Sequence, residues 1–287
     1  MTHLFHIPNT LSRWPYPRRI HPDYEEVSAE SAAWLRSFHP FSPEKQVAFD
    51  KCKFDHFRSA CDLMNVFFVF DDQTDIVDAA HARVLADIAI DAVRHPDCPR
   101  PNGEPVLGEI TRQFWARACV NSTASGRTRF EVAWMRYVEG VVGQAEDRDA
   151  GRLRTTEEYL ELRRFTIGAS PSYAFAVLKV DLPLEVSELP ILRELSEYIT
   201  DIIILDNVWC WLFAAPSFAL LTYQPQDICS YPKEYAAGDI THNMITLVMN
   251  EKHLDLDAAV AWVAGEHARR VDGFLSALAE LPQPRVA

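Results

Sequence analysis

The 287-residue chain is 48% hydrophobic, and its 41 acidic and 28 basic residues give it a formal net charge of −13. That composition can bury a sizeable core, which excludes a chain that is disordered over most of its length. The negative charge repels a phosphate backbone, so we expect no nucleic acid as a partner.

The N-terminal sequence and the cysteines indicate a reducing compartment. The opening sequence MTHLFHIPNTLSRWPYPRR lacks the continuous apolar stretch and the cleavage site of a secretory signal. The six cysteines form no CxxC pair and show no ligand-like spacing with histidine. We therefore expect a cytoplasmic protein without a zinc site or a disulfide framework.

Long stretches without glycine or proline carry apolar residues at three- and four-residue spacing, which predicts helices. The first helix follows Pro22 and the capping candidate Asp23, and it should stop at the His39-Pro40 pair. Proline-rich breaks at 95–105 and 181–183 indicate connections, and there is no internal repeat. We expect one all-α domain over residues 1–287, a helical bundle with further helices at about 55–70, 76–94, 105–121, 128–146, 156–178, 185–207, 239–250 and 255–280.

The sharpest chemical signal is the acidic sequence DDQTD at 71–75, which follows the almost uncharged run 63–70. At a helix end, Asp71 and Asp75 share a face about one turn apart, close enough to hold a hard divalent cation. Mg²⁺ completes its shell with water and substrate phosphate, so this motif beside an apolar cavity indicates an apolar diphosphate as substrate. For DDxxD alone, a solvated acidic helix end is the stronger reading; the preceding FFVF sequence and a second motif favour a metal site.

The second motif is complete only when segment 208–226 is left out. IIILDN then joins DICSYPKE, and Asn207, Ser230 and Glu234 fall at i, i+4 and i+8 on one face of one helix. Three oxygen donors on one helix face suit the coordination of metal ions. The joined text resembles the NDxxSxxxE magnesium motif of class I terpene synthases.

Segment 208–226 carries no charge and differs in composition from both flanks. Its first residue, Val208, has codons that begin with GT, its last residue, Gln226, has a codon that ends in AG, and its length in codons keeps the reading frame. We therefore hypothesise a retained intron. A genuine buried hairpin is the alternative, whereas Pro216 and Pro225 argue against a membrane-spanning helix. If every transcript contained this segment, the hypothesis of a retained intron would be wrong.

The chain is similar over most of its length to the sesquiterpene synthases of basidiomycete fungi. This resemblance implies a class I terpenoid synthase-like bundle around a central apolar cavity, with farnesyl diphosphate as substrate and three Mg²⁺ ions as cofactor. The segments that carry it, in the family's order, are WPYPR at 14–18, PDYEEVSAESAAWLRSF at 22–38, CDLMNVFFVFDDQTD at 61–75, LRRFTIGASPS at 162–172 and GDITHNMITLVM at 238–249.

The resemblance also implies roles for single residues. In the family, an arginine upstream of the asparagine motif senses diphosphate and an effector glycine follows four residues later. Arg164 and Gly168 match that pattern, and Arg163 is the adjacent candidate. Lys233 is a further diphosphate donor, although both it and the arginine pair could be surface residues. The implied metal ligands are Asp71, Asp72, Asp75, Asn207, Asp227, Ser230 and Glu234. Phe67, Phe68 and Phe70 lie on the helix that leads to the acidic motif and can lend π density to a carbocation, although not all three can point inward.

Three departures from the family bear on activity. The family usually carries about a dozen more residues near positions 54–56, and it ends with a helix bearing an Arg-Tyr pair that this chain lacks, so we expect part of the lid to be missing. Pro232 lies between Ser230 and Glu234, where a helix-interior proline costs about 3 kcal/mol.

We expect a sesquiterpene synthase that ionises farnesyl diphosphate with Mg²⁺ and cyclises the carbocation. The first alternative is a catalytically dead helical protein made from a mis-spliced transcript. A chain-elongating prenyltransferase is less favoured, because the sequence LDLDA at 254–258 lacks the spacing of a second aspartate-rich motif. The patterns specify neither the terpene skeleton nor the oligomeric state.

Overall fold

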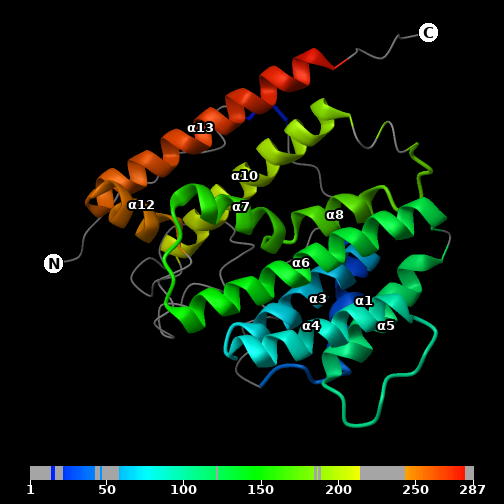
Figure 1. Cartoon of the computed structure of the whole chain (residues 1–287). Helices are drawn as coiled ribbons and strands as arrows, with labels where there is room; N and C mark the ends of the chain where they lie inside the picture. Colours follow the sequence, from blue (N-terminus) through cyan, green and yellow to red (C-terminus); the bar gives the residue numbers. More distant parts are fainter. Residues whose placement is uncertain are drawn as a thin grey trace, which may run out of the picture.

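The computed structural model describes residues 14–16, 22–42, 46, 58–120, 122–183, 186, 189–213 and 243–281. Over these ranges the chain forms helices and no strand, which confirms the expected all-α fold. None of the helices described is both long enough and apolar enough to cross a membrane. The helices, shown in Figure 1, are α1 Tyr24–Arg36, α3 Arg58–Thr74, α4 Ala79–Arg94, α5 Val106–Cys119, α6 Ala124–Ala150, α7 Thr156–Thr166, α8 Ala169–Ala176, α10 Pro190–Phe213, α12 Met244–Lys252 and α13 Leu256–Glu280.

Polar side chains define where many of these helices begin. Each of them accepts a hydrogen bond from a backbone N–H in the first turn, where no carbonyl of the helix itself is available. At α7 the Thr155 side chain accepts from Glu158 N, and the Glu158 carboxylate accepts from Thr155 N in return. The N-caps with such a bond are Asp78 of α4, Thr123 of α6, Thr155 of α7, Asn243 of α12 and Asp255 of α13.

The helix predicted over 156–178 is in fact two helices, α7 and α8, separated at Gly168. The backbone of Gly168 has a φ of +76°, in the left-handed region that ends a right-handed helix. Elsewhere the predicted helices are found with shifted ends. Helix α3 continues through Asp71 and Asp72 to Thr74, and α6 begins at Ala124, right after its N-cap.

Two buried apolar clusters hold the helices together. The first cluster joins α1, α3, α4, α5 and α6 and contains residues such as Phe70, Trp115 and Trp134. The second joins α7, α10, α12 and α13, with Leu205 and Val263 fully buried. In Figure 1, α7 and α8 lie between the long helix α6 and the group formed by α10, α12 and α13. The break at Gly168 therefore lies between the two groups of helices.

The start of α6 packs very closely against the backbone of Leu178, and a glycine-to-alanine change tests this packing. A Cβ atom at Gly126, near the start of α6, would lie 2.1 Å from the Leu178 carbonyl oxygen. We expect Gly126→Ala to lower the free energy of unfolding by about 2–3 kcal/mol, because backbone must move. Gly143→Ala on the same helix meets only Leu162 Cδ1 at 3.9 Å, and should raise it by about 0.5–1 kcal/mol. Urea unfolding of both variants tests the pair; equal stabilities would contradict it.

Candidate functional site

The three carboxylates of the acidic motif lie at the C-terminal end of α3. Asp71 and Asp72 are in its last turn, and the Asp75 backbone N–H donates to the Asp71 carbonyl oxygen at 2.9 Å. The helical hydrogen bond places Asp71 and Asp75 one turn apart on the same side, as the spacing predicts. All three side chains are half-buried rather than fully exposed. The cluster is therefore not a freely solvated helix end.

The turn of α3 before the carboxylates packs its aromatic rings against α6. Phe67 and Phe70 are buried, and their ring centroids lie 4.9 Å and 5.7 Å from the Tyr137 ring. Phe67 also stacks on Trp134 with a centroid distance of 6.0 Å. Phe68, on another side of the helix, is only half-buried. Two of the three predicted aromatic residues thus contact Tyr137, and Phe68 packs against the same apolar cluster while remaining partly exposed.

Tyr137 is a site residue that the sequence reasoning missed. It is 2% exposed, and burial raises the pKa of its phenol well above the ordinary value. The charges of Asp71 and Asp75 raise this pKa further, whereas Arg163 lowers it. The hydroxyl group therefore lies within electrostatic reach of both the acidic motif and an arginine of α7. The one feature of the sequence that could have indicated Tyr137 is its polar hydroxyl group among the apolar residues on the buried face of α6.

Gly168, at the break between α7 and α8, packs against helix α3, which carries the acidic motif. A Cβ atom at this position would lie 3.2–3.4 Å from three ring atoms of Phe67. Glycine is favoured at this position for two reasons. Any other residue would be strained at the positive φ, and its side chain would press on the Phe67 ring. The structure thus brings the predicted effector Gly168 next to Phe67, one turn before Asp71.

The two adjacent arginines of α7 point to different neighbours. Arg164 donates from Nε and Nη2 to the two carboxylate oxygens of Asp201 at 2.7 and 2.8 Å, and the carboxylate raises the Arg164 pKa. Asp201 is 2% exposed and also accepts from Arg270 Nε at 2.8 Å. This cluster links α7, α10 and α13. Arg164 is therefore already occupied by a buried carboxylate.

Arg163 lies on the side of α7 that faces α6. It contacts Thr166 Oγ1 through Nη1 at 3.3 Å. Thr166 is buried against Gly140, where an added Cβ would lie only 2.9 Å from Thr166 Cγ2. Gly140 follows Tyr137 by about one turn of α6. Of the two arginines, Arg163 is the one whose charge acts on the pKa of Tyr137, as do the charges of Asp71 and Asp75.

Helix α10 carries the predicted ligand Asn207 near its C-terminal end, and for residues 207–213 the structure gives the backbone alone. The preceding residue, Asp206, has its Oδ1 atom 3.1 Å from Nε2 of His267 on α13, without an aligned hydrogen bond. His267 is 2% exposed. This contact fixes α10 against α13 directly before Asn207. The remaining predicted site residues, Asp227, Ser230, Lys233 and Glu234, lie outside the described ranges, as does most of segment 208–226.

The donor set at the end of α3 fits a magnesium ion that is held in part by other groups. Carboxylate oxygens are the ligands that Mg²⁺ prefers, and it commonly uses one or two of them together with water and substrate phosphates. Among the described residues no group of three or more histidine, cysteine, aspartate or glutamate side chains could hold a metal on its own. The acidic motif can thus supply part of a coordination shell, to be completed by oxygen atoms from elsewhere.

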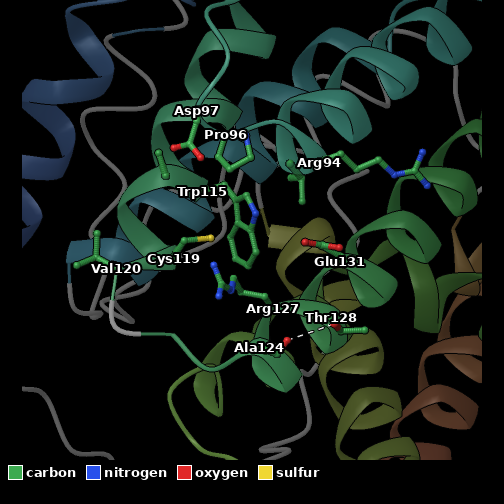
Figure 2. Close-up of a pocket in the computed structure, with 12 residues that line it drawn as sticks. Arg94, Pro96, Asp97, Trp115, Cys119, Val120, Ala124, Arg127, Thr128 and Glu131 are labelled. Carbon is green, nitrogen blue, oxygen red and sulfur yellow. Dashed lines mark hydrogen bonds between the residues drawn. The ribbon is translucent and has the colours of Figure 1, made fainter.

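A shallow hollow of about 550 Å³ opens between α4, α5 and the start of α6 (Figure 2). It is lined by Arg94 and Asp97 at the end of α4, by Trp115 and Cys119 of α5, and by Arg127 of α6. Burial raises the pKa of the Cys119 thiol to about 11, so this thiol is not activated. None of the predicted site residues that the structure describes lines this hollow, which lies at the end of α4 remote from the acidic motif.

Comparisons with known proteins agree with these features. A family model described as "Terpene synthase family 2, C-terminal metal binding" matches residues 62–273. Sesquiterpene synthase 14 of Postia placenta is 44% identical over 292 residues, covering 97% of this chain and 78% of the relative. A Delta(6)-protoilludene synthase of Stereum hirsutum is 41% identical over 291 residues, covering 97% of this chain and 74% of the relative.

Solved structures share the helical arrangement at much lower identity. A linalool/nerolidol synthase from Streptomyces clavuligerus, in complex with 2-fluorogeranyl diphosphate, superposes with a TM-score of 0.73 at 19% identity. The match covers 94% of this chain and 86% of that one. Germacradien-4-ol synthase from Streptomyces citricolor gives a TM-score of 0.73 at 19% identity, with coverages of 93% and 86%. These two likenesses establish the fold.

Proposed function

Because the chain belongs to terpene synthase family 2, we propose that it is a sesquiterpene synthase that ionises farnesyl diphosphate and cyclises the resulting carbocation. The observation that carries the proposal is the acidic end of α3, where Asp71 and Asp75 lie one turn apart beside a buried aromatic group. The fungal relatives named as sesquiterpene and protoilludene synthases support farnesyl diphosphate as the substrate. We further propose that residues 1–287 form one domain that acts in the cytoplasm.

The proposed cofactor is a cluster of three Mg²⁺ ions. When bound, these ions supply electrophilic catalysis, because they neutralise the negative charge that develops on the diphosphate leaving group. Asp71, Asp72 and Asp75 would hold the cluster from α3. From the other side, the ligands would be Asn207, Asp227, Ser230 and Glu234, which the joined reading places on one helix.

An arginine of α7, together with Lys233, is proposed to bind the diphosphate beside the metals. The resemblance to the family assigns the sensing role to Arg164, with Gly168 as effector, and Lys233 as a further donor. The contacts of α7 instead favour Arg163 for direct binding, since Arg164 is engaged by Asp201. A guanidinium group suits this task because it donates several parallel hydrogen bonds to phosphate oxygens. Binding through Arg164 would require it first to leave the buried Asp201.

After ionisation, the protein has to protect and shape a carbocation. The proposed cavity is central and apolar, and it excludes water that would quench the cation. The rings of Phe67 and Tyr137 lie directly before the acidic motif, and π-faces attract positive charge. We propose that they border the cavity at its diphosphate end, with Phe68 as a further lining candidate.

Incubation of the purified chain with farnesyl diphosphate and Mg²⁺, followed by analysis of volatiles, tests the proposed function. Sesquiterpenes released with equimolar diphosphate would support it, and chelation of Mg²⁺ should abolish them. Longer prenyl diphosphates would indicate an elongating prenyltransferase instead. The second candidate, a catalytically dead product of a mis-spliced transcript, remains the alternative because 208–226 separates Asn207 from Ser230 and Glu234. A folded chain that makes no product would support it.

Deletion of 208–226 is expected to raise turnover at least about tenfold. Helix α10 continues past Asn207 to Phe213, so its backbone direction would carry Ser230 and Glu234 onto the Asn207 face once the segments are joined. The measurement is the rate of sesquiterpene formation by the deleted and the full chain. A Glu234→Gln change in the deleted chain is the control and should cancel the gain. If the deleted chain folds but is no faster, the insertion is not what limits activity.

A further inference from the structure

The connection between α3 and α4 holds one of the proposed metal ligands but has little apolar anchoring. It runs from Asp75 to Asp78, and its central Ile76 is 66% exposed. Thr74, which ends α3, is buried, so the position of the connection beyond it depends largely on polar contacts. Asp78 caps α4 itself, and the described polar contacts that reach this segment from another helix come from the C-terminal end of α6, which lies beside the start of α4 (Figure 1).

Adjacent residues of α6 hold both ends of this connection. Arg148 Nη2 donates to the Thr74 carbonyl oxygen at 2.8 Å and to the Val77 carbonyl oxygen at 3.3 Å. Asp149 Oδ2 accepts from the Ala79 backbone N–H at 2.8 Å. The Thr74 carbonyl closes α3 and the Ala79 amide opens α4, and helix ends leave such groups without partners within the helix. Arg148 and Asp149 satisfy one group at each end.

The end of α6 is itself firmly fixed. Asp147 is 5% exposed and accepts from Arg154 Nε at 2.5 Å, which ties the end of α6 to the segment before α7. Gly151 closes α6 in the left-handed conformation with a φ of +59°. Arg148 thus donates from a stable element to the end of the acidic helix.

The charge of Arg148 matches the place where it lies. The C-terminal end of a helix carries partial negative charge from its carbonyl groups, and here three carboxylates add to it. A cation at that end reduces their mutual repulsion. We propose that Arg148 is a positioning residue that fixes the last turn of α3 and so pre-arranges Asp71 and Asp75 for a divalent cation. This inference rests on the proposed function, and it assigns Arg148 no contact with substrate.

The experiment compares Arg148→Met and Arg148→Lys with Arg152→Met. Arg152 follows the end of α6, where it pairs with Glu158 at 3.0 Å and lies 3.9 Å from Asp147, and no hydrogen bond or ion pair is described between it and 74–79. The Mg²⁺ affinity of each variant is measured by titration calorimetry in the presence of an unreactive thio analogue of farnesyl diphosphate. Loss of a residue that orients metal ligands typically weakens metal binding 10- to 100-fold. We expect at least about a tenfold weaker Mg²⁺ affinity for Arg148→Met, partial recovery for Arg148→Lys, and an unchanged affinity for Arg152→Met.

A second measurement needs neither metal nor substrate. Amide hydrogen exchange of residues 75–79 should be faster in Arg148→Met and close to wild type in Arg152→Met. Wild-type exchange in this segment, or wild-type Mg²⁺ affinity in a folded Arg148→Met variant, would overturn the inference. If the unmodified chain does not bind the analogue, the proposed function fails, and the exchange data still decide whether Arg148 holds the segment. If Arg148→Met does not fold, Arg148→Lys decides the same questions through the same two measurements.

Discussion

Replacement of Asp71 by asparagine is expected to lower kcat/KM for farnesyl diphosphate at least about 100-fold. The amide keeps the shape of the side chain but loses its negative charge and one anionic oxygen, so it holds a hard divalent cation poorly. Residues that only orient metal ligands already contribute about 10- to 100-fold, and a direct ligand should contribute more. Folding should change little, because the loss of one carboxylate relieves repulsion from Asp72 and Asp75.

The control for this variant is Asp87→Asn on α4, an exposed carboxylate whose oxygen lies 3.9 Å from Arg83. It makes the same change of charge away from the acidic motif and should leave turnover within about twofold, as is usual for isolated surface ion pairs. Product formation by both variants is measured by gas chromatography at saturating Mg²⁺. An Asp71→Asn chain that turns over like Asp87→Asn would remove the acidic motif from the mechanism.

Replacement of Arg163 by glutamine is expected to lower kcat/KM for farnesyl diphosphate about 100-fold and to leave the free energy of unfolding almost unchanged. Its charge lowers the pKa of Tyr137, which the charges of Asp71 and Asp75 raise, and we expect its guanidinium to donate charged hydrogen bonds to the leaving diphosphate. Replacement of Arg164 by glutamine should mainly affect stability. Asp201 is buried and would keep Arg270 alone, so we expect a loss of about 1–3 kcal/mol.

The two arginine variants separate the two assignments of the diphosphate contact. Each is measured twice, by kinetics with farnesyl diphosphate and by urea unfolding. A large kinetic loss for Arg164→Gln at unchanged KM for Mg²⁺, with Arg163→Gln close to wild type, would return the sensing role to Arg164. In that case Arg164 exchanges Asp201 for the diphosphate during catalysis.

Most of the fold could be predicted, because short stretches of sequence determine where the helices lie and where they begin. Apolar spacing predicts the helices, and polar residues such as Asp78 and Asp255 mark where they begin. The position of the acidic motif at the end of an apolar helix also follows from local sequence, and α3 ends within it. The family resemblance, which the comparisons confirm, rests on such short segments.

What could not be predicted depends on contacts between distant residues. A single glycine within a helical pattern is usually tolerated, so the break at Gly168 becomes clear only from its φ and from the Phe67 ring. Consecutive residues of a helix point about 100° apart, and no local pattern says which of Arg163 and Arg164 faces the acidic motif. Likewise, nothing near Arg148 in the sequence indicates that it reaches the end of α3.

Binding of an unreactive thio analogue of farnesyl diphosphate, titrated with and without Mg²⁺, tests the central claim most directly. In the chain without 208–226, where the second motif is joined, we predict binding that requires Mg²⁺ and that weakens at least about tenfold in both Asp71→Asn and Glu234→Gln, because both motifs hold the same metals. Binding that is equally strong without Mg²⁺, or that neither substitution weakens, would contradict joint coordination of the diphosphate by the two motifs.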